Sequence, residues 1–326
     1  MKKLFVIILT LFAVVSVMAQ QAKIESLPNQ YYDKYELKTS KDTITFYLSV
    51  TTHNDNLPLV VYIHGSGWNS LFNERNNEIV PTSGHSIWAN VGKERHRILI
   101  VEKPGVNYLQ TEESKEFQEK FSLESRSNTI VDAINYVLQN ENIDKHKVLI
   151  AGHSEGGIVA AKVANLMKEK ISNVVVMAGE GASQLYSLYK LADDGTFFNS
   201  KEHNMPTSEE RIQYLTNRWK DILADPMSTE KKFFGFTYLR WSSMLSTSVI
   251  DELTNYNEKI LFIQGTADKA VYPETATVAY VTLLTKGKNV ELQLIENADH
   301  SFRILDKPEV DGWKMVIEKI MEWFHK

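Results

Sequence analysis

The sequence predicts an α/β protein in which helices cover both faces of a mostly parallel central sheet and a helical cap is inserted in the second half of the chain. Short apolar runs, which are typical of buried strands, alternate with stretches whose apolar residues recur at helical spacing. This alternation indicates strand–helix–strand units and hence parallel pairing. The strands stop between residues 182 and 258, and this helical, aromatic-rich interval is too long for an ordinary connection.

The composition restricts the classes of function. The 326 residues carry a net charge of −5 and show no basic stripe, so a nucleic-acid partner is not expected. Cysteine is absent, which excludes disulfides, a thiolate nucleophile and cysteine-ligated metals. The histidines form no cluster with ligand spacing, and the sequence has no H-E-x-x-H or phosphate-loop motif, so no metal site is expected.

The first residues have the features of a secretory signal peptide. Lys2 and Lys3 precede an apolar run, and Ala19 stands where a signal peptidase cleaves. The run is shorter than the roughly 18–20 residues that a membrane-spanning helix needs, so no stable membrane anchor is expected after cleavage. Residues 1–19 are therefore predicted to be a signal peptide, and the mature protein is expected in the periplasm or outside the cell.

Residues 20–181 are predicted to form the first part of the core. Apolar and polar residues alternate at 35–39 and 43–50, as they do in half-exposed strands. Continuous apolar runs at 59–63 and 97–101 predict buried strands.

A strand, a tight turn and a helix follow one another around Ser154. An apolar run at 148–151 leads into residues 152–156, which match G-x-S-x-G, and an apolar helical pattern follows directly. This order is typical of a nucleophile elbow, in which a serine hydroxyl is exposed on a sharp corner. Gly152 and Gly156 lack a Cβ, which lets the strand and the helix pack closely.

The chain after the elbow continues the same pattern on both sides of the cap. A further strand is predicted at 174–178. The cap, residues 182–258, contains aromatic side chains that either line a substrate pocket or pack the cap onto the body. Residues 259–326 form the second part of the core, with strands at 259–263 and 290–295 and a final amphipathic helix.

Three residues occur in the order that nucleophilic catalysis needs on such a sheet. A serine hydroxyl attacks only when a base takes its proton, and a carboxylate orients that base. Ser154, Asp268 and His300 each lie just past the carboxyl end of a predicted strand, in the expected order of nucleophile, acid and base. Glu180 also follows a strand and is the alternative acid.

The oxyanion of the tetrahedral intermediate needs hydrogen-bond donors. The Glu155 N–H, directly after the nucleophile, is one candidate. The second is the Ser66 N–H in the turn after the strand at 59–63, where Gly65 and Gly67 allow a close approach.

The segments at 152–157 and 64–67 resemble those of α/β-hydrolases, in particular bacterial secreted esterases and the catalytic domains of prolyl-oligopeptidase-like enzymes. The resemblance extends from the first strands to the final helix. It implies an α/β-hydrolase fold and a Ser–Asp–His triad that uses no cofactor. The roles it carries over are those of Ser154, Asp268, His300, Ser66 and Glu155. The chain departs from many relatives at 102–105, where Glu-Lys-Pro-Gly replaces Asp-Lys-Arg-Gly.

These observations lead to three hypotheses of function. The first is a secreted serine hydrolase that cleaves carboxylic esters. The second keeps the triad but cleaves a peptide, an aminoacyl amide or a thioester, and an acidic group in the pocket would favour a charged amine. The third is a binding protein with an idle triad, because fold and motif do not prove turnover. The expected partner is a small-molecule ester or a short peptide, and the sequence makes no prediction of oligomeric state.

Overall fold

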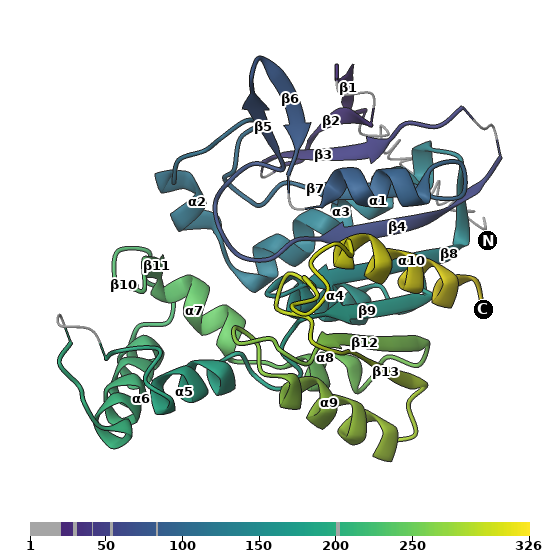
Figure 1. Cartoon of the computed structure of the whole chain (residues 1–326). Helices are drawn as coiled ribbons and strands as arrows, with labels where there is room; N and C mark the ends of the chain where they lie inside the picture. Colours follow the sequence, from purple (N-terminus) through teal and green to yellow (C-terminus); the bar gives the residue numbers. More distant parts are fainter. Residues whose placement is uncertain (1–20, 29–30, 41, 53–54, 83, 200–202) are drawn as a thin grey trace, which may run out of the picture.

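The computed structural model describes residues 21–28, 31–40, 42–52, 55–82, 84–199 and 203–326 (Figure 1). The predicted signal peptide at 1–19 lies outside these residues. Within them, nine strands form one sheet in the order β1-β2-β3-β7-β4-β8-β9-β12-β13. Their bounds are β1 Lys23–Ser26, β2 Tyr32–Lys38, β3 Thr43–Ser49, β4 Leu57–Ile63, β7 Arg97–Val101, β8 Ile143–His153, β9 Asn173–Met177, β12 Lys259–Gly265 and β13 Val290–Ile295.

The sheet is mostly parallel, which confirms the predicted fold class. β1, β2, β3 and β7 pair antiparallel in succession, whereas every pair from β7 through β4, β8, β9 and β12 to β13 is parallel. The side chains of β7 and β9 are buried along their whole length, because helices cover both faces of a parallel sheet.

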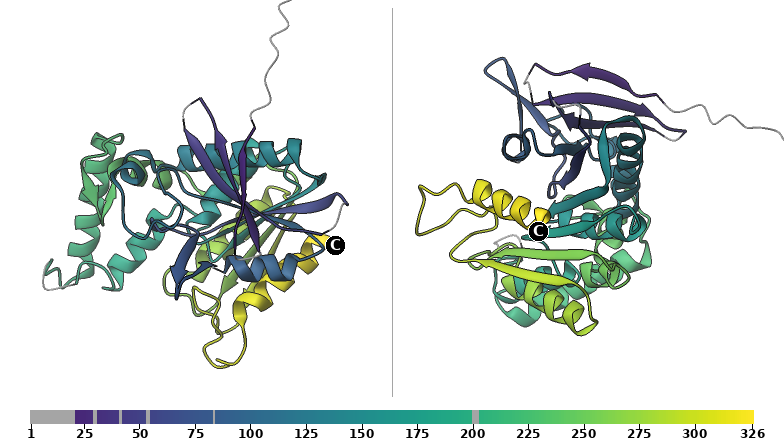
Figure 2. Two further views of the ribbon diagram at one scale, coloured as in Figure 1. Left: turned by 90° about the horizontal axis from the view of Figure 1, so that it is seen from above. Right: turned by 90° about the vertical axis from the view of Figure 1, so that its right-hand side faces the viewer.

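Two helical layers enclose the sheet (Figures 1 and 2). The side chains of β4 alternate between them, with Leu59 and Val61 in one apolar core and Val60 and Tyr62 in the other. The first core is closed by α3 Leu123–Asn140, α4 Gly156–Leu166, α8 Val249–Leu253 and α9 Pro273–Thr285. The second core is closed by α1 His85–Gly92 and α10 Gly312–His325.

A helical segment between β9 and α8 projects from the body (Figures 1 and 2). Its elements are α5 Leu185–Asp193, α6 Ser208–Ala224, the short strands β10 Lys232–Phe233 and β11 Phe236–Thr237, and α7 Tyr238–Leu245. It has its own apolar cluster, which includes Leu188, Phe198, Leu215 and Trp241. The β10–β11 hairpin adds two strands to a segment that the sequence pattern predicts to be helical. Most of the aromatic side chains of the cap pack in or against its own apolar cluster.

Other parts of the chain differ in detail from the sequence pattern. Helix α8 lies inside the interval predicted as the cap, yet Val249 and Leu253 pack in the core of the body.

The segment after β4 forms the hairpin β5 Phe72–Arg75 and β6 Glu78–Pro81, which the sequence pattern did not predict. The turn residues of this hairpin, at positions 76 and 77, are both asparagines with positive φ, 53° and 63°, which suits a two-residue hairpin turn.

The remaining short helix, α2 Lys115–Lys120, precedes α3. None of the helices in the described part of the chain has the length and apolar character that crossing a membrane requires.

Candidate active site

Ser154 occupies a strained corner between β8 and α4. Its φ of 56° lies in the left-handed region, which non-glycine residues rarely adopt without a functional reason. A Cβ added to Gly152 would lie 2.0 Å from the Gly156 carbonyl oxygen, and one added to Gly156 would lie 2.2 Å from the Ile63 carbonyl oxygen. Only glycine fits at either position, so the predicted reason for both glycines holds.

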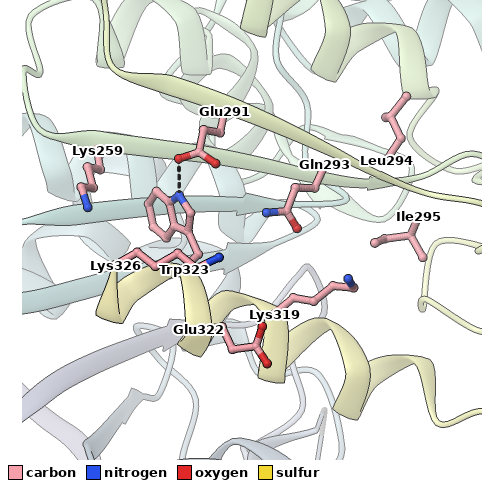
Figure 3. Close-up of a pocket in the computed structure, with 9 residues that line it drawn as sticks. All are labelled: Lys259, Glu291, Gln293, Leu294, Ile295, Lys319, Glu322, Trp323 and Lys326. Carbon is pink, nitrogen blue, oxygen red and sulfur yellow. Dashed lines mark hydrogen bonds between the residues drawn. The ribbon is translucent and has the colours of Figure 1, made fainter.

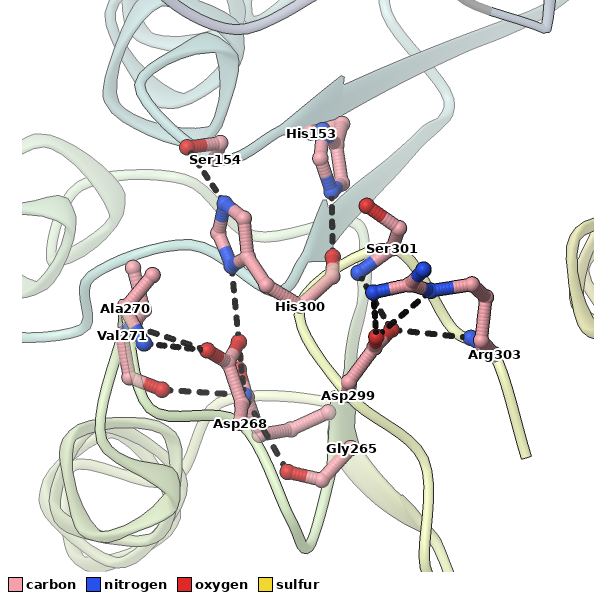
Figure 4. A network of polar contacts seen from close by, with 11 residues as sticks. His153, Ser154, Gly265, Asp268, Ala270, Val271, Asp299, His300, Ser301 and Arg303 are labelled. Carbon is pink, nitrogen blue, oxygen red and sulfur yellow. Dashed lines mark hydrogen bonds and ion pairs between the residues drawn. The ribbon is translucent and has the colours of Figure 1, made fainter. Parts of the chain in front are cut away.

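The structure brings Ser154, His300 and Asp268 together (Figure 4). The Ser154 Oγ lies 3.0 Å from the His300 Nε2, and the His300 Nδ1 lies 2.8 Å from the Asp268 Oδ2. The Nδ1–H donates to the carboxylate, so Nε2 is left unprotonated in the neutral ring and can accept the serine proton. The three residues follow β8, β12 and β13, whose carboxyl ends meet at one edge of the sheet.

The Asp268 carboxylate is buried and held by several donors. Its Oδ1 accepts hydrogen bonds from the backbone N–H groups of Ala270 and Val271, at 2.8 and 2.9 Å. Its Oδ2 accepts a further bond from the Gln264 Nε2 at 2.9 Å. These contacts fix the carboxylate in the orientation that receives the imidazole N–H.

Glu180 lies near this site, but its carboxyl group makes no contact with His300. It is buried, and its Oε2 has no hydrogen-bond partner among the residues that the structure describes. Burial raises the pKa of Glu180 to about 8, an effect that Ser187 partly offsets and the charge of Asp268 increases. The geometry therefore favours Asp268 over Glu180 as the acid of the triad.

The turn after β4 lies against the nucleophile. A Cβ added to Gly65 would lie 3.1 Å from the Ser154 Cβ and 3.5 Å from its Oγ. The backbone of Gly65 therefore passes close to the nucleophile.

Two buried basic side chains hold this turn in place. The Arg126 Nη2 donates to the His64 carbonyl oxygen at 2.5 Å, and the Lys103 Nζ donates to the Gly67 carbonyl oxygen at 2.8 Å. Lys103 belongs to the segment at 102–105 that departs from the pattern of many relatives. In this chain, Lys103 and Arg126 together restrain the turn.

The side chain of Glu155 forms a buried ion cluster with two arginines. Its Oε1 lies 3.0 Å from the Arg126 Nη1, and its Oε2 is paired with the Arg240 Nη2 of helix α7. The Arg240 guanidinium also lies 3.8 Å from the centre of the Trp241 ring. Burial would raise the pKa of Glu155, but Arg240 and Arg126 outweigh it and hold the pKa below its usual value. The cluster joins the body, the nucleophile turn and the cap.

Sequence reasoning assigned Glu155 a role only through its N–H and missed both arginines. The available signal was a carboxylate directly after the nucleophile, next to Gly156. The partners of Glu155 lie far away in the sequence, so no local pattern identifies them.

We expect the substitution Glu155→Gln to lower the free energy of unfolding by about 3–5 kcal/mol, because it leaves two buried arginines without their counter-charge. Urea denaturation checks this value. The control is Glu318→Gln, which alters an exposed pair with Lys314 and should leave the midpoint almost unchanged. Equal midpoints for the two variants would contradict the proposed contribution.

His153 supports the loop that carries the catalytic base. Its Nε2 lies 2.9 Å from the His300 carbonyl oxygen (Figure 4), and its ring packs on Trp313 with centroids 4.9 Å apart. Burial lowers the pKa of His153 to about 4, and the neighbouring His300 adds to this effect. The neutral ring therefore donates its Nε2–H to the carbonyl.

This lowered pKa predicts a loss of stability in acid. Between pH 6.5 and pH 4 the unfolded chain protonates His153 and the folded chain does not, so the free energy of unfolding should fall as pH falls. The contribution is on the order of 2–3 kcal/mol. Urea denaturation of the His153→Gln variant should show a smaller fall across this range than wild type, whereas the variant of an exposed histidine, His146→Gln, should follow wild type. Parallel curves for all three proteins would contradict the assignment.

Two of the spaces in the described part of the protein differ in their relation to Ser154. A groove of about 440 Å³ lies between β13 and α10, and the Trp323 Nε1 donates to the Glu291 Oε1 there at 2.8 Å (Figure 3). None of the candidate catalytic residues lines it.

The second space is a cavity of about 10 Å³ beside Ser154, which matches the roughly 10–15 Å³ that one water needs. Its lining residues are Ser154, Glu155, Ile158, Glu180, Ala182, Gln184, Met244 and Thr247.

Metal ligands do not gather at this site. Among the described residues, no group of three or more His, Cys, Asp or Glu side chains has an arrangement that could hold a metal ion.

Comparisons with known proteins identify the family of this fold. The model of a family described as "Alpha/beta hydrolase family" matches residues 60–310. No protein with a curated description matches the sequence.

Similar solved structures include Est1E from Butyrivibrio proteoclasticus, with a TM-score of 0.57 and 14% identity over 90% of this chain and 98% of that one. An arylesterase has a TM-score of 0.56 and 15% identity over 94% of this chain and 86% of that one. The acylaminoacyl peptidase of Pyrococcus horikoshii has a TM-score of 0.60 and 15% identity over 95% of this chain and 42% of that one. At these identities the likeness shows a shared fold.

Proposed function

Because the chain belongs to the alpha/beta hydrolase family, we propose that it is a serine hydrolase that cleaves carboxylic esters of small or medium acyl groups. The observation that carries this proposal is the continuous hydrogen-bonded chain from the Ser154 Oγ through His300 to Asp268. An idle triad in a binding protein would need no such alignment. Esterases among the proteins of similar structure support the choice of substrate class.

The proposed reaction passes through an acyl-enzyme. The His300 Nε2 takes the proton of the Ser154 hydroxyl as Oγ attacks the ester carbonyl carbon, and Asp268 stabilises the resulting imidazolium. The tetrahedral intermediate collapses, and His300 returns the proton to the departing alkoxide. Water then attacks the acyl-serine, with His300 again as base, and releases the acid and the free Ser154.

The proposed oxyanion donors are the N–H groups of Glu155 and Ser66. Two observations support them: helix α4 begins at Gly156, directly after the nucleophile turn, and Gly65 lies against Ser154. One such donor typically contributes about 3 kcal/mol to transition-state stabilisation.

A second candidate reaction uses the same triad on aminoacyl amides or short peptides. The observation that favours it is the buried carboxyl of Glu180 in the cavity beside Ser154. Peptidases among the proteins of similar fold support this second candidate.

A hydrolysis panel tests the proposal. Nitrophenyl esters of increasing acyl length are compared with aminoacyl nitroanilides, and a fluorophosphonate reports whether Ser154 is activated. Ester turnover together with labelling of Ser154 supports the esterase, and anilide turnover with weak ester activity supports the second candidate. Absence of both turnover and labelling would refute the proposed function.

A further inference from the structure

The cavity beside Ser154 is formed where the cap meets the body. Ser154, Glu155 and Ile158 come from the nucleophile turn and helix α4, and Glu180 follows β9. Gln184 just before α5, Met244 of α7 and the nearby Thr247 close it from the cap side. The space suits a group about the size of one water molecule.

The polar side chains that line this cavity present acceptors. The Glu180 Oε2 and the Gln184 Oε1 are both buried and lack a hydrogen-bond partner among the described residues. The hydroxyl of Thr247 already donates to Glu252 at 3.1 Å, and that of Ser154 faces His300. A ligand that presents hydrogen-bond donors would satisfy these two unpartnered oxygens.

The charges of the lining residues also favour a ligand with hydrogen-bond donors. The Glu155 carboxylate is neutralised by two arginines, whereas Glu180 has no ion pair within the described structure. No lysine, arginine or histidine is among the described residues that line the cavity. A cation that entered it would meet the buried carboxyl group of Glu180, whereas the excess positive charge of the Glu155 cluster belongs to arginines that do not line the cavity.

The position of the cavity places the ligand on the acyl side of the scissile bond. Glu155, whose N–H is a proposed oxyanion donor, lines the cavity. His300, which serves the leaving group, is absent from the described lining residues. A group in this cavity therefore belongs to the acyl part of the substrate.

From this geometry we infer that the cavity binds the protonated amino group of an aminoacyl substrate, with Glu180 as its counter-ion and Gln184 as a second acceptor. An ammonium group is about the size of a water molecule and carries only donors, so it fits both the volume and the walls. The preferred substrates are then short aminoacyl esters or amides. This inference rests on the proposed serine hydrolase function and names the substrate class of the same site.

The raised pKa of Glu180 agrees with this assignment. Without a cation, burial keeps the carboxyl group protonated at neutral pH, and a nearby ammonium would favour the carboxylate. The carboxyl group then forms a charge-assisted hydrogen bond, which is shorter and stronger than a neutral one.

Two isosteric esters test the inference. Alanine methyl ester and methyl isobutyrate differ only in that an ammonium replaces a methyl group, and acid release is followed in a pH-stat. In wild type the ratio of kcat/KM for the two esters should favour alanine methyl ester, and Glu180→Gln should lower that ratio by about 10- to 100-fold. Comparison between proteins cancels the difference in intrinsic reactivity of the esters.

The matched control is Glu296→Gln, which makes the same change from carboxyl to amide at an exposed residue directly after β13. This variant should keep both the ratio and the rates of wild type. An unchanged ratio in Glu180→Gln would overturn the inference, because the carboxyl group would then have no contact with the amine.

A second measurement needs no variant. Diphenyl 1-aminoethylphosphonate should label Ser154 of wild type faster than its isosteric neutral analogue, diphenyl isopropylphosphonate, and equal or reversed rates would overturn the inference. If neither ester is hydrolysed and neither phosphonate labels Ser154, the proposed hydrolase function fails and the inference falls with it. Labelling without the preference for the amine refutes the inference alone.

Discussion

The substitution Ser154→Ala should lower kcat for ester hydrolysis by about 10⁵- to 10⁶-fold, the scale of nucleophile loss in a serine triad. Without the hydroxyl no acyl-enzyme forms, and His300 loses the proton donor that lies 3.0 Å from its Nε2. Alanine keeps the Cβ of serine, so the strained φ of 56° is retained and the elbow should fold as before. Initial rates on a short nitrophenyl ester measure the loss.

The control for this change is a second serine at the same site. Ser301→Ala removes an exposed hydroxyl next to His300, while the backbone N–H of residue 301 keeps its 2.9 Å bond to Asp299. This variant should retain the rate of wild type. If Ser154→Ala keeps a comparable rate, the nucleophile lies elsewhere.

The second large effect is expected from Asp268→Asn, which should lower kcat by about 10⁴-fold. The His300 Nδ1–H now donates to a carboxylate at 2.8 Å. An asparagine can turn its NH₂ toward Nδ1, which places the imidazole proton on Nε2, where it blocks transfer from Ser154. The shape of the side chain is preserved, so unfolding in urea should show a folded protein.

The matched comparison is Glu180→Gln, which makes the same change from carboxyl to amide in the other candidate acid. With methyl isobutyrate as substrate, its loss of kcat should be far smaller than that of Asp268→Asn. The reverse order would show that Glu180 is the acid of the triad.

The sequence alone predicted the features that local patterns encode. The apolar runs and helical spacing predict the mostly parallel sheet, because burial on one or both faces of an element determines its periodicity. The glycines at 152 and 156 identify the elbow, because a side chain there would collide with backbone about 2 Å away. Asp268 and His300 were predicted as site residues because parallel strands bring their carboxyl ends to one edge of the sheet.

Tertiary structure alone decided which distant groups meet. Asp268 and Glu180 both follow strands, and only the packed fold directs one of them to His300, at 2.8 Å, and the other into a cavity shared with the cap. The partners of Glu155 come from α3 and α7, which no local pattern joins to the elbow. The physical reason is that such contacts depend on how all the helices and strands pack together and on where their side chains then point. Strand, turn and helix patterns depend only on a few neighbouring residues.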